Sequence, residues 1–226
     1  MTEEYFYHYT NEEAAKDILL SGHILPSLVG GGDAAHGNGV YLTTLEPRLG
    51  RGTVMNNNWA GAAVDKNIDA YFEIFMPTSE VRRAMDKRDI QVFSGILELA
   101  DYTWNLRSWD DGELLATQFF MVSSQGGAAK IYDDLMGKYE LATNIVTSDD
   151  AAVYEHVEGE AYLYRYNDGS FTNWSVGLTA GWSKSLFQQL NEVSTSSPSK
   201  TCPWQYMKED GGTWQDDVTL KVFPSY

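Results

Sequence analysis

The chain has 226 residues and a formal net charge of −16, which excludes nucleic acid as a bulk partner because phosphate backbones repel an acidic surface. Hydrophobic residues make up 43% of the chain, enough to bury the core of one large domain or two small ones. Its single cysteine excludes an intramolecular disulfide and a metal site built on several thiolates.

The N-terminal segment predicts a strand followed by an amphipathic helix. Residues 5–10 are aromatic and β-branched, which is typical of a strand. Thr10 or Asn11 then provides a cap, because a short polar side chain can accept a hydrogen bond from a free N–H group of the first helical turn. Apolar residues recur at helical spacing as far as Leu19, and Gly22 supplies the stop.

The rest of the chain alternates helices and strands before it becomes rich in strands. A glycine-rich loop is expected over 29–39, followed by a strand at 40–43. Residues 48–66 predict a loop and a helix containing Trp59, and 70–76 predict a strand. The remaining predicted elements are a helix over 78–88, strands over 89–93 and 96–102, a helix over 128–141, strands over 151–157, 160–167 and 170–177, a helix over 183–193, and a hairpin formed by 204–208 and 213–223.

The pattern of elements changes between residues 105 and 127, where mixed helices and strands give way to closely spaced strands. No internal repeat and no low-complexity tract accompanies this change. We therefore divide the chain into a domain at 1–127 and a C-terminal β-rich extension at 128–226.

Two segments about 30 residues apart bear on function. The first is 8–10 (His-Tyr-Thr) at the end of the first strand, followed on the helix by 18–22 (Ile-Leu-Leu-Ser-Gly). The second is 37–43, which reads Gly-Asn-Gly-Val-Tyr-Leu-Thr. Together they resemble the NAD⁺-binding core of the ADP-ribosyltransferases related to diphtheria toxin and the poly(ADP-ribose) polymerases, and most closely the HYD1-type branch of bacterial-toxin-like transferases. The resemblance covers roughly residues 5–105.

The resemblance implies a role for four residues at the nicotinamide end of the ligand. His8 would bond a hydroxyl of the nicotinamide-side ribose, and the backbone of Tyr9 would pair with the nicotinamide carboxamide. Thr10 would contact the same group, and Tyr41 would stack on the nicotinamide ring.

Five further residues are implied in NAD⁺ binding. Gly37 and Gly39 would let the backbone approach the ligand, since neither carries a Cβ. Trp59 lies where relatives place a second aromatic ring against the nicotinamide. Arg48 or Arg51 could meet the pyrophosphate, because a planar guanidinium matches the geometry of phosphate oxygens.

Cleavage of the bond between C1′ and nicotinamide develops positive charge on the ribose, which a nearby acidic residue would stabilise. The resemblance places this residue on a later strand, and Asp89, which opens the predicted strand 89–93, is our first choice. Glu98, Asp101 and Gln91 remain alternatives.

The resemblance implies an α+β fold with a split, two-sheet β core of the ADP-ribosyltransferase type, surrounded by peripheral helices. The implied function is mono-ADP-ribosylation of a macromolecule such as a protein, or hydrolysis of NAD⁺, with NAD⁺ as a substrate and no metal. The alternative is a catalytically inactive module that binds NAD⁺ or ADP-ribose, or that docks a protein. In a third interpretation the motif is a coincidence within an ordinary β-rich interaction protein.

Other chemistries find no support in the sequence. The four histidines show no metal-ligand spacing, and neither a Gly-x-Ser-x-Gly elbow nor a dinucleotide or Walker phosphate loop is present. The chain contains no apolar run of about 18 residues, so no membrane span is expected. The N-terminus does not resemble a secretory signal, which makes a cytoplasmic protein, or a toxin effector delivered by dedicated machinery, the expectation.

Overall fold

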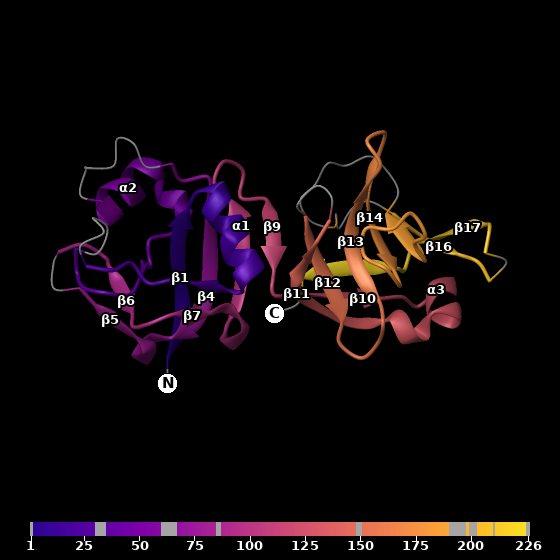
Figure 1. The fold of residues 1–226 in the computed structure, drawn as a ribbon, viewed down its shortest axis with the longest axis horizontal. Coiled ribbons are helices and arrows are strands. Elements are labelled where there is room, and N and C mark those ends of the chain that lie inside the picture. The colour runs from indigo at the N-terminus through magenta and orange to yellow at the C-terminus, as the bar shows by residue number, and fades with distance from the viewer. Residues whose placement is uncertain are drawn as a thin grey trace. The chain divides into compact units, whose positions relative to one another are not determined.

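The computed structural model describes residues 2–29, 35–59, 67–84, 87–147, 151–189, 198, 203–209 and 211–224. The protein is mixed and rich in strands, and it divides into two compact units, Met1–Leu115 and Ala116–Tyr226 (Figure 1). The division falls inside the 105–127 interval where the sequence pattern changes, and ahead of the boundary that we placed between 127 and 128.

The larger sheet of unit 1 has the strand order β1-β4-β8-β9. In it β1 (Glu3–Thr10) pairs antiparallel with β4 (Ala70–Pro77), which pairs antiparallel with β8 (Thr103–Ser108). The far edge is β9 (Leu114–Thr117). Neighbouring side chains of β4 are buried on both faces of this sheet, which explains why its sequence is a nearly continuous apolar run.

A smaller sheet of unit 1 has the order β3-β6-β5. Here β3 (Val40–Leu42) pairs antiparallel with β6 (Gln91–Phe93), which also pairs with β5 (Val81–Arg83). A separate two-stranded pair joins β2 (His23–Ile24) to β7 (Leu97–Glu98). The strands that carry the two sequence motifs, β1 and β3, therefore belong to different sheets.

In the described part of unit 1, two α-helices accompany these sheets, and both lie where the sequence predicts a helix. The first, α1 (Glu12–Ser21), is capped by Asn11, whose Oδ1 accepts a hydrogen bond of 2.8 Å from the N–H of Ala14. It ends at Gly22, which adopts the left-handed conformation with φ of 75°. The second, α2 (Arg51–Trp59), ends on the tryptophan that the sequence places in a helix, and residues 60–66 lie outside the described residues.

The helix predicted over 78–88 is wrong. The segment forms the short 3₁₀ helix η2 (Thr78–Glu80) and then β5, because pairing with β6 overrides the local helical pattern. Residue 85, on which that pattern depends, lies outside the described residues. The strand predicted over 96–102 is reduced to β7 and a second 3₁₀ helix, η3 (Leu99–Asp101), while η1 (Pro47–Leu49) precedes α2.

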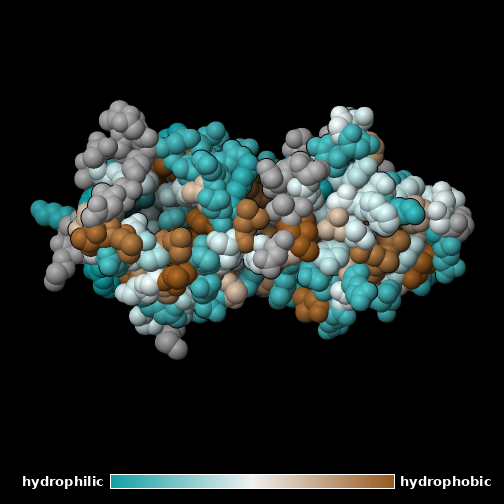
Figure 2. Space-filling model, in the orientation of Figure 1, coloured by the Kyte–Doolittle hydropathy of each residue, from teal (hydrophilic) through white to brown (hydrophobic). Residues whose placement is uncertain are grey.

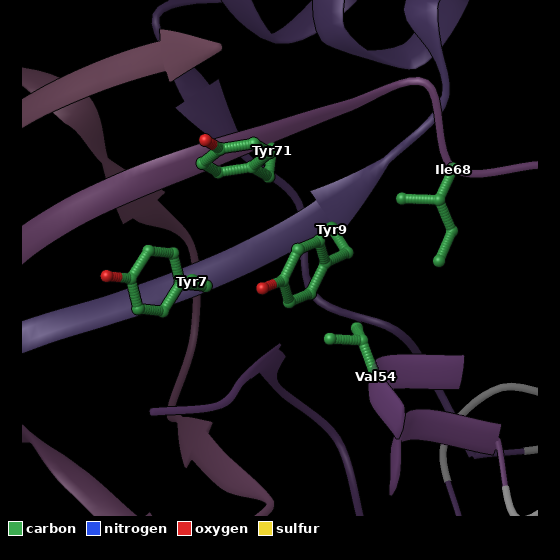
Figure 3. Packing of buried hydrophobic residues seen from close by; sticks show 5 residues of the cluster. All are labelled: Tyr7, Tyr9, Val54, Ile68 and Tyr71. Carbon is green, nitrogen blue, oxygen red and sulfur yellow. The ribbon is translucent and has the colours of Figure 1, made fainter. Parts of the chain in front are cut away.

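An aromatic cluster forms part of the core of unit 1 on one face of the larger sheet. It comprises Tyr7, Tyr9, Val54, Ile68 and Tyr71, each less than 10% exposed (Figure 3). Tyr7 and Tyr9 are two residues apart on β1, so their rings lie on the same face, with centroids 6.2 Å apart. The side chain of His8 therefore points to the opposite face.

Unit 2 is built on one antiparallel sheet of nine strands. Eight of them follow one another in chain order, and the last strand, β18, pairs with the first, β10. The strands are β10 (Phe119–Ser123), β11 (Gly137–Val146), β12 (Ala152–His156), β13 (Tyr162–Asn167), β14 (Thr172–Gly177), β15 (Phe187–Gln189), β16 (Trp204–Met207), β17 (Trp214–Asp217) and β18 (Lys221–Pro224).

The short link between the last two strands forces this sheet to curl. Only residues 218–220 join β17 at one edge of the sheet to β18 at the other edge. Four Cα steps reach at most about 15 Å, whereas nine strands laid flat at about 4.8 Å spacing would separate the two edges by about 38 Å. The sheet closes toward a barrel around a core rich in tyrosine and tryptophan.

Two further helix predictions, both in unit 2, are wrong. Within 128–141 only the short α3 (Gly127–Ile131) and η4 (Asp133–Leu135) are helical, and the remainder belongs to β11. Within 183–193 the described residues contain the strand β15, and 190–193 lie outside them. No helix in the described ranges is long and apolar enough to cross a membrane.

Candidate functional site

A cavity of about 920 Å³ opens in unit 1, a volume typical of a site for a small molecule or cofactor. Five of the residues predicted from the sequence line it: His8, Tyr9 and Thr10 at the end of β1, Tyr41 on β3, and Trp59 at the end of α2. The fold thus brings together two motifs that are about 30 residues apart in the chain.

A hydrogen bond joins the two motifs directly. Nδ1 of His8 lies 3.1 Å from the carbonyl oxygen of Tyr41. A carbonyl oxygen can only accept, so Nδ1 carries the proton. Burial lowers the pKa of His8, and the bond to the Tyr41 carbonyl opposes that shift without reversing it. The imidazole is therefore neutral at pH 7, and its Nε2 is an acceptor.

The backbone of Tyr9 faces the gap between the two sheets. Two backbone hydrogen bonds of 2.8 and 3.1 Å pair Tyr7 with Thr43, and this is an isolated bridge. Backbone groups of alternate residues in a strand point to the same edge, so the N–H and C=O of Tyr9 turn away from β4, as those of Tyr7 do. Among the described residues neither group has a partner on that edge.

The side chain of Tyr9 packs into the core, so the residue lines the cavity with its backbone. Its ring belongs to the buried aromatic cluster (Figure 3). Its hydroxyl donates a hydrogen bond of 2.7 Å to the carbonyl oxygen of Leu45. Trp59 packs against the same cluster while also reaching the cavity. Tyr9 therefore presents a donor and an acceptor of fixed direction, one strand residue away from His8.

Tyr41 ties the glycine-containing loop to its own strand. Its hydroxyl donates to the carbonyl oxygen of Gly37 and accepts from the N–H of His36, both at 2.8 Å. Gly37 and Gly39 do not line the cavity. A Cβ on Gly39 would lie 2.5 Å from the carbonyl oxygen of Phe93, so this glycine allows the loop to approach β6, rather than the approach to a ligand that the sequence suggested.

The two arginines expected at a pyrophosphate lie away from the cavity lining. Arg48 forms an ion pair with Glu46 at the surface. Arg51 donates a hydrogen bond to the carbonyl oxygen of Ile68, and its guanidinium carbon lies 5.7 Å from the centre of the Trp109 ring. Neither arginine lines the cavity.

A different arginine, Arg88, lines the cavity. Its Nη1 donates to the carbonyl oxygen of Asn57 at 3.1 Å, and its Nη2 lies 2.8 Å from Nε2 of His36. Guanidinium groups only donate, so Nε2 of His36 accepts. The sequence motifs did not include Arg88, and its place directly before the predicted strand 89–93 was the signal that could have singled it out.

The carboxylate of Asp89 is hydrogen-bonded to neighbouring residues and does not face the cavity. Its carboxylate accepts hydrogen bonds from the hydroxyl of Thr43 at 2.9 Å, from the N–H and hydroxyl of Thr44 at 2.6 and 2.7 Å, and from Nε2 of Gln91 at 3.0 Å. Burial raises the pKa of Asp89, but these hydrogen bonds outweigh it and leave the pKa below its usual value. Asp89 does not line the cavity.

The three alternative residues do not line the cavity either. Glu98 is exposed on β7, Asp101 is exposed in η3, and the side chain of Gln91 donates to Asp89. Among the described residues that do line it, the one carboxylate belongs to Asp17 on α1, which sequence reasoning did not single out. Its spacing of three residues from Ala14 and four from Ser21, which puts the three on one side of the helix, was the available signal.

No family model matches the chain, and the searches of curated proteins and of solved structures find no significant match. Within the described ranges, no group of three or more His, Cys, Asp or Glu side chains could hold a metal ion.

Proposed function

We propose that the cavity of unit 1 binds NAD⁺ and that the chain cleaves it, as an ADP-ribosyltransferase or as an NAD⁺ glycohydrolase. The observation that carries this proposal is the hydrogen bond from His8 to the Tyr41 carbonyl at the wall of the cavity. It joins the two motifs that resemble this superfamily. Separate sheets for β1 and β3, linked by the isolated Tyr7–Thr43 bridge, are what a split two-sheet core would need.

The nicotinamide carboxamide has one acceptor oxygen and an NH₂ donor, which complement the N–H and C=O of Tyr9. Two such hydrogen bonds contribute about 1 kcal/mol each after the loss of hydration. Nε2 of His8 would accept a hydrogen bond from a ribose hydroxyl, which fixes the orientation of the sugar. Tyr41 and Trp59 supply aromatic surface for the nicotinamide ring.

The pyrophosphate would lie against Arg88. Its guanidinium is fixed by the Asn57 carbonyl and by His36, so little side-chain entropy remains to be lost when an anion binds. Because the whole chain carries a charge of −16, a fixed local cation would offset the repulsion of the dianionic pyrophosphate.

In the reaction, the bond between C1′ of the ribose and the nicotinamide nitrogen breaks, and its electron pair leaves with neutral nicotinamide. The ribose acquires the positive charge until a nucleophile attacks C1′ and loses a proton. If the nucleophile is water, the products are ADP-ribose, nicotinamide and a proton. If a protein side chain reaches C1′, the product is an ADP-ribosylated protein.

The position of Asp89 favours a second candidate function, a module that binds NAD⁺ or ADP-ribose without cleaving it. Its carboxylate accepts hydrogen bonds from Thr43, Thr44 and Gln91, and neither Asp89 nor any of Glu98, Asp101 and Gln91 lines the cavity. Stabilisation of the ribose cation would then be weak, and the site would retain recognition alone.

Two measurements on the full chain distinguish the two candidate functions. Calorimetry with NAD⁺ reports binding, and chromatography after incubation with NAD⁺ reports nicotinamide and ADP-ribose. We expect binding and nicotinamide release in the wild type, and loss of both in His8→Ala. Tyr5→Ala, an exposed position on the same strand, serves as the matched control and should behave as the wild type.

Binding without release would support the non-catalytic module. A wild-type protein that binds neither NAD⁺ nor ADP-ribose in calorimetry, and releases no nicotinamide, would contradict both candidates. Circular dichroism of each variant distinguishes loss of the site from loss of the fold.

A further inference from the structure

One face of α1 forms a long wall of the cavity. Ala14, Asp17, Ile18 and Ser21 all line it, at the spacing of three and four residues that places side chains on one side of a helix. Asn11, the cap of the helix, lines it as well. Glu12, Glu13 and Lys16 are exposed away from this wall, where the surface is largely hydrophilic (Figure 2) and Leu20 is an exposed apolar exception.

The helix α1 runs along the cavity, so the two ends of the cavity can be told apart by the two ends of the helix. From Asn11 to Ser21 the helix advances about 15 Å, at about 1.5 Å for each residue. The groups that recognise nicotinamide lie at its N-terminal end, because Tyr9 and Thr10 directly precede Asn11. If nicotinamide binds there, as the proposed function requires, the adenosine half of NAD⁺ extends along α1 toward Asp17 and Ser21.

Asp17 has the chemistry to recognise a ribose. Its side chain is exposed, and no described residue forms an ion pair with its carboxylate or hydrogen-bonds to it. A carboxylate can accept hydrogen bonds from both vicinal hydroxyls of a ribose, whereas it repels a phosphate at the 2′ position. The cation of the cavity, Arg88, is bound to His36 and Asn57, which belong to other segments than α1.

We propose that Asp17 makes this site selective for NAD⁺ over NADP⁺, by accepting hydrogen bonds from the 2′ and 3′ hydroxyls of the adenosine ribose. This inference rests on the proposed function and adds to it a determinant of which dinucleotide is bound. Asp17 is here a specificity residue. It lies about 9 Å along the helix from Asn11, away from the nicotinamide end where the bond to C1′ breaks.

The test compares the affinities of NAD⁺ and NADP⁺ by calorimetry at fixed ionic strength, with the full-length protein. We expect the wild type to bind NAD⁺ more tightly than NADP⁺ by about tenfold or more, the value of one charge-assisted contact. Asp17→Asn should weaken NAD⁺ binding and narrow the ratio of the two affinities. Asp17→Arg should reverse the preference, because the new guanidinium can pair with the 2′-phosphate.

Glu13→Gln is the matched control. It removes one negative charge from the same helix, as Asp17→Asn does, but Glu13 does not line the cavity. Its affinity ratio should equal that of the wild type. If Glu13→Gln changed the affinity ratio as much as Asp17→Asn does, the selectivity would come from the net charge of the protein, and the proposal would be overturned.

The remaining outcomes separate this inference from the proposed function. Equal binding of NAD⁺ and NADP⁺ by the wild type overturns the selectivity and leaves NAD⁺ binding intact. Binding of neither dinucleotide overturns both. If Asp17→Asn lowers the rate of nicotinamide release while the affinity ratio is unchanged, Asp17 acts on the reaction and the assignment to the adenosine ribose is wrong.

Discussion

At the scale of single residues, the polar groups of the site have their protonation and direction set by the protein. The carbonyl of Tyr41 determines which nitrogen of His8 carries the proton, and burial keeps the ring neutral. The side chain of Asn57 holds both backbone groups of Asp89, at 2.8 Å each. Such fixed geometry is what a preorganised binding site requires, because little remains to be ordered when the ligand arrives.

His8 gives a prediction about pH. Because its pKa in the folded protein lies below the ordinary value of 6.5, the unfolded chain binds more protons between the two values. The stability contributed by neutral His8 is therefore complete above pH 6.5 and is lost as the pH falls below it. We expect the free energy of unfolding of the wild type to decrease more than that of His8→Gln between pH 7 and pH 5, as measured by urea denaturation.

Asp89 gives a second prediction about pH, and its stabilisation is also lost on acidification, in a more acidic range than that of His8. Its pKa lies below 3.8 when folded, so its stabilisation is present above pH 3.8 and is lost as the pH falls through the folded value. Asp89→Asn should reduce the free energy of unfolding by about 1–3 kcal/mol at pH 7. This difference should disappear in acid, where the wild-type carboxyl is also uncharged.

The same variant tests the role that the sequence assigned to Asp89. Its carboxylate does not line the cavity, so a folded Asp89→Asn protein should retain NAD⁺ binding. Asp110→Asn, at an exposed position, controls for the loss of one charge. Nicotinamide release that survives in Asp89→Asn would exclude Asp89 as the acidic residue of the reaction.

At the scale of elements, local signals predicted α1 and β1 well because the determinants are local. The cap Asn11, the stop Gly22 and the alternating residues of β1 act within a few residues of one another. The helix predicted over 128–141 failed because β11 is stabilised by partners far away in sequence. Tyr139, for example, is buried between β10 and β12.

The candidate site divides in the same way. His8 and Tyr41 could be found from the sequence because each belongs to a short motif. Arg88 and Asp17 could not, because their presence in the cavity depends on how β6 and α1 are placed around it. Two hydrogen bonds of Arg88 join it to residues 31 and 52 positions away, a relation that no local pattern records.

Gly39 gives a prediction at this scale, because it allows the loop before β3 to lie against β6. Gly39→Ala would place a Cβ 2.5 Å from the Phe93 carbonyl and from a methyl group of Val92, at a φ of +152°. We expect a loss of about 1–3 kcal/mol of stability together with weaker NAD⁺ binding. Gly52→Ala in α2, where a Cβ meets nothing within 4 Å, should keep binding and gain up to about 1 kcal/mol. Equal effects of the two substitutions would contradict this role of Gly39.

At the scale of the whole molecule, each of the two units is compact in itself, and of the strands only β9 (Leu114–Thr117) spans the boundary between them in the described part of the chain. Unfolding of the chain therefore need not be a single two-state transition, and the two units can unfold in separate steps. The cavity lies entirely within unit 1, so a ligand of that cavity stabilises the unit that contains it. The stability of unit 2 depends instead on the contacts that hold the two ends of its curled sheet together.

Asp217 sits at that closure and makes the independence of the units testable. Its carboxylate accepts hydrogen bonds from Ser124 and the Ala128 N–H, and from the N–H and hydroxyl of Thr219, at 2.6–3.0 Å. These bonds tie the end of β17 to the segment after β10. Asp217→Asn should lower the thermal transition of unit 2, and Asp216→Asn, an exposed neighbour, should leave it unchanged.

NAD⁺ should act on the other transition. At a free concentration of about 100 times Kd it adds about 2.7 kcal/mol to the stability of the unit that binds it. We therefore expect calorimetric scans of Asp217→Asn to show the unit 2 transition lowered, and NAD⁺ to raise the unit 1 transition by the same amount as in the wild type. If NAD⁺ instead restored the transition that Asp217→Asn lowers, binding and the curled sheet would be coupled. The recognition of NAD⁺ would then be a property of both units rather than of residues 1–115 alone.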